Sequence, residues 1–128
     1  MPLNWKISHP DRSVEAVATG HLSLQDIERY FDDLMVSGAF PYRKLFDVTE
    51  ATSAVDDAEM MLLGARMSAY KGLGPLGPLA IVVPTTPLRT QAMLFAALAP
   101  ADRPLKIFNT AAAARKWLDA PLGSEEAR

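Results

Sequence analysis

In the first part of the chain, apolar residues recur at every second position. Leu3, Trp5 and Ile7 alternate with polar residues, which is typical of a strand with one buried and one solvated face. Residues 9–12 interrupt the alternation with a His-Pro-Asp-Arg sequence that suits a type I turn. Apolar positions resume over residues 13–19, so the sequence predicts a β-hairpin whose first strand lies at a sheet edge.

The period then changes to that of a helix. Ser23 and Asp26 have the spacing of a capping box, while Leu22 and Ile27 have the spacing of a hydrophobic staple. Gly38 stands where a helix C-cap belongs. The apolar stripe between these ends consists of Ile27, Phe31, Leu34 and Met35. The sequence therefore predicts a helix whose acidic outer face is solvated or, alternatively, binds a partner.

A strand and a second helix are predicted in the middle of the chain. Leu45, Phe46 and Val48 belong to the strand, and residues 49–52 have the composition of a polar turn. Ser53 is a candidate helix cap, because an acidic first turn and then apolar periodicity follow it. A strand that leads through a short turn into a capped helix is half of a βαβ unit, which indicates an α/β fold.

The second helix is apolar on two sides. One side carries Met60, Leu63, Met67 and Tyr70. Much of the remaining surface carries Met61, Leu62, Ala65 and Ala69. Such a helix is either buried on both sides by ordinary core packing or has a second apolar face for a partner or ligand. Because successive helical residues are about 100° apart, we expect at least one of the residues 60–62 to be partly exposed or to line a cavity.

The last third of the chain continues the alternation of strands and helices. Residues 72–78 form a Gly-Pro loop without phosphate-loop spacing, and residues 79–83 are an unbroken apolar run, expected at the centre of a parallel sheet. Thr85 or Thr86 is expected to cap a third helix. Residues 105–108 predict a last strand, and the final helix carries Ala114, Trp117 and Leu118.

The order of these elements is ββαβαβαβα. This order predicts an α/β fold with a mixed five-stranded sheet and four helices, in which the later strands run parallel. At 128 residues the chain has the length of one domain, expected over residues 1–120. Residues 121–128 are polar beyond a proline and are expected to form a flexible tail.

Composition and charge exclude several classes of function. With 13 Lys and Arg against 15 Asp and Glu, the net charge of -2 argues against binding to nucleic acid or to an anionic membrane. There are no cysteines, which excludes disulfides, thiolate nucleophiles and Cys-ligated metals. Neither a signal peptide pattern nor an apolar run of membrane-spanning length is present, so we expect a cytoplasmic protein without a membrane span.

The sequence offers little for catalysis. His9 lies in a turn and His21 before a helix, with no spaced acidic pair to complete a metal site, so no metal is expected. Neither histidine stands at the end of a parallel strand, where the base of a Ser or Thr nucleophile belongs. We expect a chain that is not an enzyme and has no cofactor. The candidate site for an anion is the start of the third helix, with Thr85, Thr86 and Arg89.

The whole arrangement resembles a known group of domains. The residues that carry the resemblance are Trp5-Lys6-Ile7, Gly20-His21-Leu22-Ser23, Leu45-Phe46-Asp47, Ala80-Ile81-Val82, and Phe108 with Ala114, Trp117 and Leu118. In their order and spacing they are similar to the SpoIIAA-like group of STAS-type domains, over nearly the whole chain. The resemblance implies a small bacterial domain that either binds a regulatory protein through the loop and helix after the third strand or holds an apolar, lipid-like ligand.

The resemblance also places the candidate site for a partner or ligand. Its residues are Thr49, Ser53, Asp56, Asp57, Met60, Met61 and Arg66. In the anti-sigma-antagonist branch of the group, this helix start carries a phosphorylatable serine in an Asp-Ser-Ser-Gly setting. Asp57 stands in that place here, so no phospho-switch is expected at this position.

Two classes of function follow from the sequence. The first is a non-enzymatic regulatory or protein-interaction module whose partner is another protein or a second copy of the chain. The alternative is a carrier or sensor of a small apolar ligand, held between the second helix, the Gly-Pro loop and the third helix.

Overall fold

The computed structural model describes residues 2–53, 55–83, 86–98 and 104–120. Its strands are β1 (Leu3–Ser8), β2 (Ser13–His21), β3 (Arg43–Ser53), β4 (Leu79–Val82) and β5 (Leu105–Phe108). Its helices are α1 (Leu24–Ser37), α2 (Asp57–Lys71), α3 (Thr86–Leu98) and α4 (Ala111–Asp119). The predicted order ββαβαβαβα is confirmed. The tail predicted over residues 121–128 lies outside the described residues, so the domain boundary at residue 120 stays a prediction.

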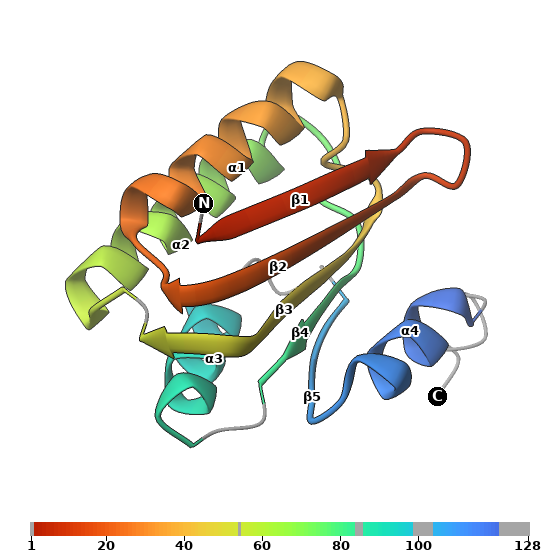
Figure 1. Ribbon diagram of the computed structural model, residues 1–128. Coiled ribbons are helices and arrows are strands. Elements are labelled where there is room, and N and C mark those ends of the chain that lie inside the picture. Colours follow the sequence, from red (N-terminus) through yellow and green to blue (C-terminus); the bar gives the residue numbers. More distant parts are fainter. Residues whose placement is uncertain (1, 54, 84–85, 99–103, 121–128) are drawn as a thin grey trace.

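All five strands form one mixed sheet of order β1-β2-β3-β4-β5 (Figure 1). β1 pairs antiparallel with β2, and every later pair of neighbours is parallel. The predicted hairpin and the edge position of β1 are confirmed. The prediction that residues 79–83 lie at the sheet centre is wrong by one strand, because each strand adds beside its predecessor and β3 is therefore the middle one.

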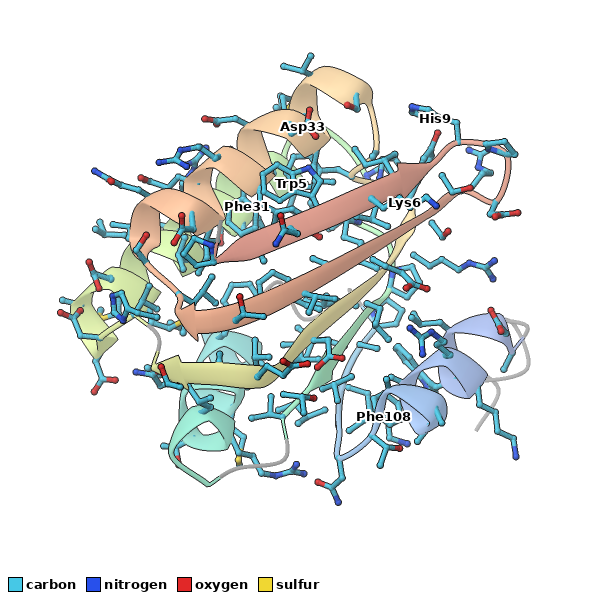
Figure 2. All side chains as sticks on the ribbon, in the orientation of Figure 1. Trp5, Lys6, His9, Phe31, Asp33 and Phe108 are labelled. Carbon is cyan, nitrogen blue, oxygen red and sulfur yellow. The ribbon has the colours of Figure 1, made fainter. Side chains whose placement is uncertain are left out.

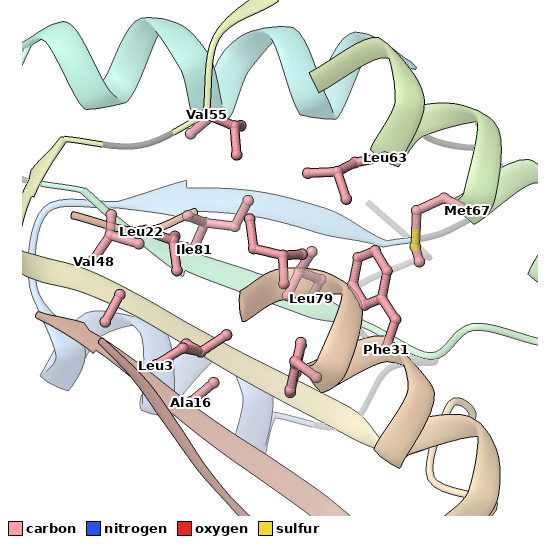
Figure 3. Packing of buried hydrophobic residues seen from close by; sticks show 14 of the residues in the cluster. Leu3, Ala16, Leu22, Phe31, Val48, Val55, Leu63, Met67, Leu79 and Ile81 are labelled. Atoms are coloured by element: carbon pink, nitrogen blue, oxygen red, sulfur yellow. The ribbon is translucent and has the colours of Figure 1, made fainter. Parts of the chain in front are cut away.

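The helices cover both faces of the sheet. α1, α2 and α3 pack on one face over the larger core, and α4 packs on the other face against β3, β4 and β5 (Figures 1 and 3). Along β4, Leu79 and Ile81 belong to the larger core, while Ala80 and Val82 pack with α4. The unbroken apolar run of this strand is thus explained by helices on both sides of the sheet.

The predicted ends of the first helix are confirmed. Ser23 is the N-cap of α1; its hydroxyl oxygen accepts from the Asp26 N–H at 3.2 Å, and Asp26 Oδ2 accepts from the Ser23 N–H at 3.1 Å. Gly38 ends the helix in the left-handed conformation with φ of 68°, a backbone shape that favours glycine. Leu22 and Ile27 are both buried, as a hydrophobic staple requires.

Tertiary contacts then fix α1 above the hairpin. The indole Nε1 of Trp5 on β1 donates to Asp33 Oδ2 of α1 at 2.6 Å (Figure 2). The Trp5 ring also meets the Tyr30 ring edge-on, with the centroids 5.4 Å apart. The edge strand is therefore held by α1 as well as by its pairing with β2.

β3 is longer than the sequence predicts. Residues 49–52, expected to form a turn, continue the strand to Ser53 in parallel pairing with β2. The pairing passes through two register shifts, opposite Val17–Thr19 and opposite Gly20–His21 of β2, and at each of them β3 has one extra residue. The predicted turn is wrong because pairing with a neighbouring strand satisfies the backbone groups of a polar segment whatever its side chains.

Candidate functional site

The start of α2 is acidic and capped. Asp56 is the N-cap; its Oδ1 accepts from the Glu59 N–H at 2.8 Å, and Glu59 Oε1 accepts from the Asp56 N–H at 3.1 Å. Ser53 is the last residue of β3, so the prediction that it caps the helix is wrong. β3 includes the residues that the sequence assigned to a turn, so the helix begins later. Its N-cap is Asp56, the next residue after Ser53 whose side chain can accept a hydrogen bond. Asp57 is the exposed first residue of α2.

Thr49 lies apart from this helix start. The Thr49 hydroxyl and N–H both donate to Asp47 Oδ1, the N–H at 2.9 Å. Asp47 shares the face of Leu45, on which α4 packs, and the hydrogen bonds to Asp47 hold the Thr49 side chain beside it. The structure therefore does not bring Thr49 together with Met60, which is buried on the opposite face.

The two apolar sides of α2 have different surroundings. Met60 is buried, whereas Met61 is 61% and Leu62 is 57% exposed. The expectation that one of these three residues reaches solvent is confirmed. The solvent face of α2, here called the outer strip, consists of Ala58, Met61, Leu62, Ala65, Ser68 and Ala69, all exposed. Apart from one serine this strip is apolar, and no helix or strand covers it in the part of the chain that the structure describes.

Arg66 belongs to the contact between α2 and α1. Its guanidinium lies 3.4 Å from Glu28 Oε2 and 2.9 Å from Asp32 Oδ1, and it also donates to the Tyr70 hydroxyl. It stacks over the Phe31 ring, with 5.7 Å to the centroid. Partial burial lowers the pKa of Arg66, but the hydrogen bonds that its guanidinium donates to Asp32 and Tyr70 outweigh this effect, so the pKa is raised overall. Arg66 thus fastens the two helices together beside the outer strip.

A cavity of about 100 Å³ lies between the sheet and helices α1, α2 and α3. Its wall is almost entirely apolar; α2 contributes Met60, Leu63 and Met67, and α3 contributes Leu88, Ala92 and Phe95. Figure 3 shows Leu63 and Met67 of this wall on the side of the sheet that carries Leu79 and Ile81 of β4. The sequence predicted an apolar site between the second and third helices, and the cavity is where these helices meet. The Gly-Pro loop is not part of the wall.

Besides Tyr30, two polar side chains line the cavity, Lys44 and Gln91. Lys44 is only 2% exposed, and its ammonium group donates to the carbonyl oxygens of Phe40, Tyr42 and Leu76. Gln91 of α3 donates through Nε2 to the Val55 carbonyl, while its Oε1 is buried and accepts from no described residue. Sequence reasoning missed both. The available signal was that Gln91 lies three residues after Leu88 and four before Phe95, on the apolar side of its helix.

The candidate anion site at the third helix is only partly described. Thr85 lies outside the described residues, and Thr86 is the first residue of α3. Arg89 Nη1 donates to the Val83 carbonyl at 3.4 Å and to Asn109 Oδ1 at 3.0 Å. The arginine therefore bridges the ends of two neighbouring strands, and the anion site stays a prediction.

The two histidines lie apart from each other: His9 is in the turn between β1 and β2, and His21 is the last residue of β2, next to Leu22 of the cavity wall. His9 Nδ1 is 2.8 Å from the Tyr42 hydroxyl oxygen, at the hairpin end of the sheet. Within the described ranges no three His, Asp or Glu side chains gather closely enough to hold a metal ion. In the same ranges no helix has both the length and the apolar character needed to cross a membrane.

Comparison with known proteins bears on the fold. No protein-family model matches the sequence, and no curated protein is similar enough to count as a match. One similar solved structure is an uncharacterized DUF3478-family protein with a SpoIIAA-like fold from Shewanella loihica PV-4, with a TM-score of 0.60, 20% identity and 91% of each chain covered. Another is the anti-sigma factor antagonist SpoIIAA in its unphosphorylated form, with a TM-score of 0.61 and 14% identity over 93% of this chain and 99% of that chain. The mixed sheet with four helices is a SpoIIAA-like fold, as the sequence resemblance predicts.

Proposed function

We propose that this protein is a non-enzymatic regulatory module that binds another protein through the outer strip of α2. The observation that carries the proposal is the exposure of Met61 and Leu62, at 61% and 57%, on a helix whose opposite side is already buried. Apolar side chains gathered on one solvent face are typical of a protein contact. The SpoIIAA-like fold supports a regulatory role, since one of the similar structures is an anti-sigma factor antagonist.

The other candidate residues take different parts in this proposal. Asp56 and Asp57 add negative charge at one end of the outer strip, which favours a partner with basic side chains there. Arg66 supports the surface from behind, because its ion pairs with α1 hold the helix in place. Ser53 at the end of β3 and Thr49 on the α4 face lie off the strip and would meet only a partner that extends past the helix start.

A pair of methionines provides the test. Met61→Lys places a charge in the outer strip, while Met93→Lys makes the same change on α3 at a residue with a similar exposure of 58%. Both variants are expected to keep their unfolding midpoint, since exposed substitutions usually change stability by less than about 0.5 kcal/mol. We expect Met61→Lys to weaken partner binding about tenfold, as for the loss of a central apolar contact, and Met93→Lys to leave it unchanged.

Two measurements compare partner binding by the Met61→Lys and Met93→Lys variants. Sedimentation velocity over a range of concentrations detects a second copy of the chain, and quantitative affinity capture from a lysate of the source organism detects another protein. If neither measurement distinguishes Met61→Lys from Met93→Lys, the outer strip is not the binding surface. Unfolding of Met61→Lys alone would show that this side of α2 is needed for folding.

The cavity favours a second function, the binding of a small apolar molecule between the sheet and α1, α2 and α3. Its apolar wall and its volume of about 100 Å³ are the supporting observations. Binding of toluene by the wild-type chain, followed through the methyl NMR signals of Leu63 and Met67, tests this function. Unchanged methyl signals at saturating toluene would refute it.

A further inference from the structure

The volume of the cavity limits what can enter it. An engineered cavity of about 150 Å³ with an apolar wall accepts benzene, whereas pockets for drug-sized ligands measure about 300–1,000 Å³. At about 100 Å³, the cavity between the sheet and α1–α3 matches a single ring or a chain of a few carbon atoms. The long acyl chain of a lipid does not fit entirely within this volume. The lipid-like ligand expected from the sequence therefore narrows to a much smaller molecule.

The side-chain oxygen of Gln91 indicates that the ligand carries a hydrogen-bond donor. Gln91 Nε2 donates to the Val55 carbonyl, and this bond fixes which end of the carboxamide is the oxygen, because two carbonyl oxygens would repel each other. Gln91 Oε1 is consequently a buried acceptor with no donor among the described residues. Buried acceptors nearly always have a donor, so a molecule in this cavity is selected for having one.

Lys44 does not supply a second polar contact of this kind. Its ammonium group is directed to the main-chain carbonyls of Phe40, Tyr42 and Leu76, on the side of the cavity wall formed by β3. In all three hydrogen bonds Lys44 is the donor. It therefore offers no acceptor to a donor group of a ligand. Of Lys44 and Gln91, it is therefore the Gln91 oxygen that offers an acceptor to a ligand donor.

We propose that the cavity binds a neutral, ring-sized apolar molecule that carries one hydroxyl or N–H group, and that this group donates to Gln91 Oε1. The proposal rests on the second function given above, the binding of a small apolar molecule, and specifies the chemistry of the ligand. Phenol is the simplest member of this class. A water molecule bound at Gln91 Oε1 is the alternative occupant and is distinguished by the experiment below.

Phenol and toluene make a matched pair of probes, since they have similar size and differ in one hydroxyl against one methyl group. In a cavity without an acceptor, phenol is rejected because its hydroxyl loses its hydrogen bonds to water and gains none. With Gln91 as acceptor, we expect phenol to bind the wild-type chain at least as tightly as toluene. Titrations followed by NMR and by calorimetry give both dissociation constants.

The variant Gln91→Met removes the acceptor and keeps the length of the side chain. We expect it to weaken phenol binding about tenfold or more while changing toluene binding less than about threefold. Gln25→Met, the same substitution at an exposed position on α1, is the matched control and leaves both constants unchanged. If Gln91→Met fails to fold, the wild-type comparison of phenol, anisole and toluene still decides, because anisole has no donor.

Each outcome has a definite meaning. If toluene binds and phenol does not, the apolar-ligand function stands and the proposal for Gln91 is overturned. The proposal is also overturned if phenol binds and Gln91→Met does not weaken its binding. Absence of binding by both probes overturns the proposal and the function on which it rests. If water at Gln91 Oε1 is the native occupant, phenol gains no advantage from the oxygen and the same rejection is observed.

Discussion

Lys44 and Gly77 hold the start of β3 against the loop before β4. The ammonium group of Lys44 bonds to carbonyl oxygens on both segments, those of Phe40 and Tyr42 before β3 and that of Leu76 before β4. Gly77 lies in the left-handed region with φ of 76°, and a Cβ built on it would overlap carbonyl oxygens of the segment before β3. Glycine is therefore required there for both its backbone shape and its size.

Gly77 and Gly38 allow these two requirements to be separated. Both have a φ near 70°, but a Cβ at Gly38 would meet no atom within 4 Å. We expect Gly38→Ala to cost only the left-handed backbone energy, about 1 kcal/mol, and Gly77→Ala to cost about 3 kcal/mol or more because the added carbon also overlaps the backbone. Urea unfolding of the two variants checks the difference. Equal midpoints would show that the loop moves away freely.

At the level of single elements, the start of α1 is coupled to pH. The hydrogen bond from the Ser23 side chain lowers the pKa of Asp26, burial opposes this effect, and the Ser23 backbone N–H and Arg29 lower the pKa further. A carboxylate whose pKa is lowered on folding stabilises the folded state above its unfolded pKa of about 3.9. That stabilisation is lost as the pH falls through the folded-state pKa.

The variant Asp26→Asn keeps the acceptor oxygen and removes the charge. Relative to wild type it should lose about 0.5–1 kcal/mol at pH 7, and this difference should shrink as the pH falls below about 4. Urea unfolding at a series of pH values gives the measurement. In a Ser23→Ala background the effect of Asp26→Asn should be smaller at neutral pH, since the main contact of the carboxylate is gone. A difference that grows on acidification would contradict the assignment.

α2 and α3 pack at a glycine. A Cβ at Gly64 would lie 2.9 Å from the Leu98 Cβ, closer than carbon atoms approach without overlap. Inside a helix, alanine is favoured over glycine by about 1 kcal/mol, while overpacking a contact of this kind costs about 1–3 kcal/mol. The cost of overpacking should exceed the gain in helix propensity, because a Cβ is fixed to the backbone and cannot rotate aside.

We therefore expect Gly64→Ala to destabilise the protein by about 1 kcal/mol, against the direction of helix propensity. Ser68→Ala, at an exposed position of the same helix, should raise stability slightly and is the control. The midpoints of urea unfolding compare the two. A stabilised Gly64→Ala would show that α3 shifts to admit the methyl group and that this contact does not limit the approach of the helices.

For the whole molecule, the sheet is protected most in its middle. β3 has neighbours on both edges and helices on both faces, and β4 shares these features. β1 and β5 each have one free edge in the described part of the chain. Opening of the central strands exposes the most apolar surface, so it should require nearly the full free energy of unfolding.

Hydrogen exchange measures this directly. We expect the amides of Leu45, Phe46, Ala80 and Ile81 to exchange slowest, near the rate set by global unfolding. Amides of β1 that point away from β2 should exchange orders of magnitude faster. Equal rates in the edge strand and in β3 would mean that β1 is covered in solution, for example by a second copy of the chain.

The sequence by itself determined the local structure and the order of elements. Ser23, Asp26 and Gly38 sufficed for the ends of α1, because capping depends on residues within one turn of the helix. The apolar periods sufficed for five strands, four helices and a mixed sheet whose later strands are parallel, since period and chain order leave few ways to build such a sheet. The SpoIIAA-like arrangement was predicted by the resemblance of the motifs in their order and spacing. The two apolar sides of α2 were also evident, because the angle between successive residues is fixed.

Only the tertiary structure decided what depends on neighbours distant in sequence. β3 continues to Ser53 because β2 lies beside it, and that pairing moved the cap of α2 to Asp56. The contact of Arg66 with α1 was not evident from the sequence, because its carboxylate partners are distant in the chain. Asp32, for example, lies 34 residues before it. The buried oxygen of Gln91 became a candidate ligand contact only because the packing of α3 against the sheet and the other helices places Gln91 in the wall of a cavity. Periodicity fixes which side of an element is buried, but the shape of the space between packed elements depends on all of them together.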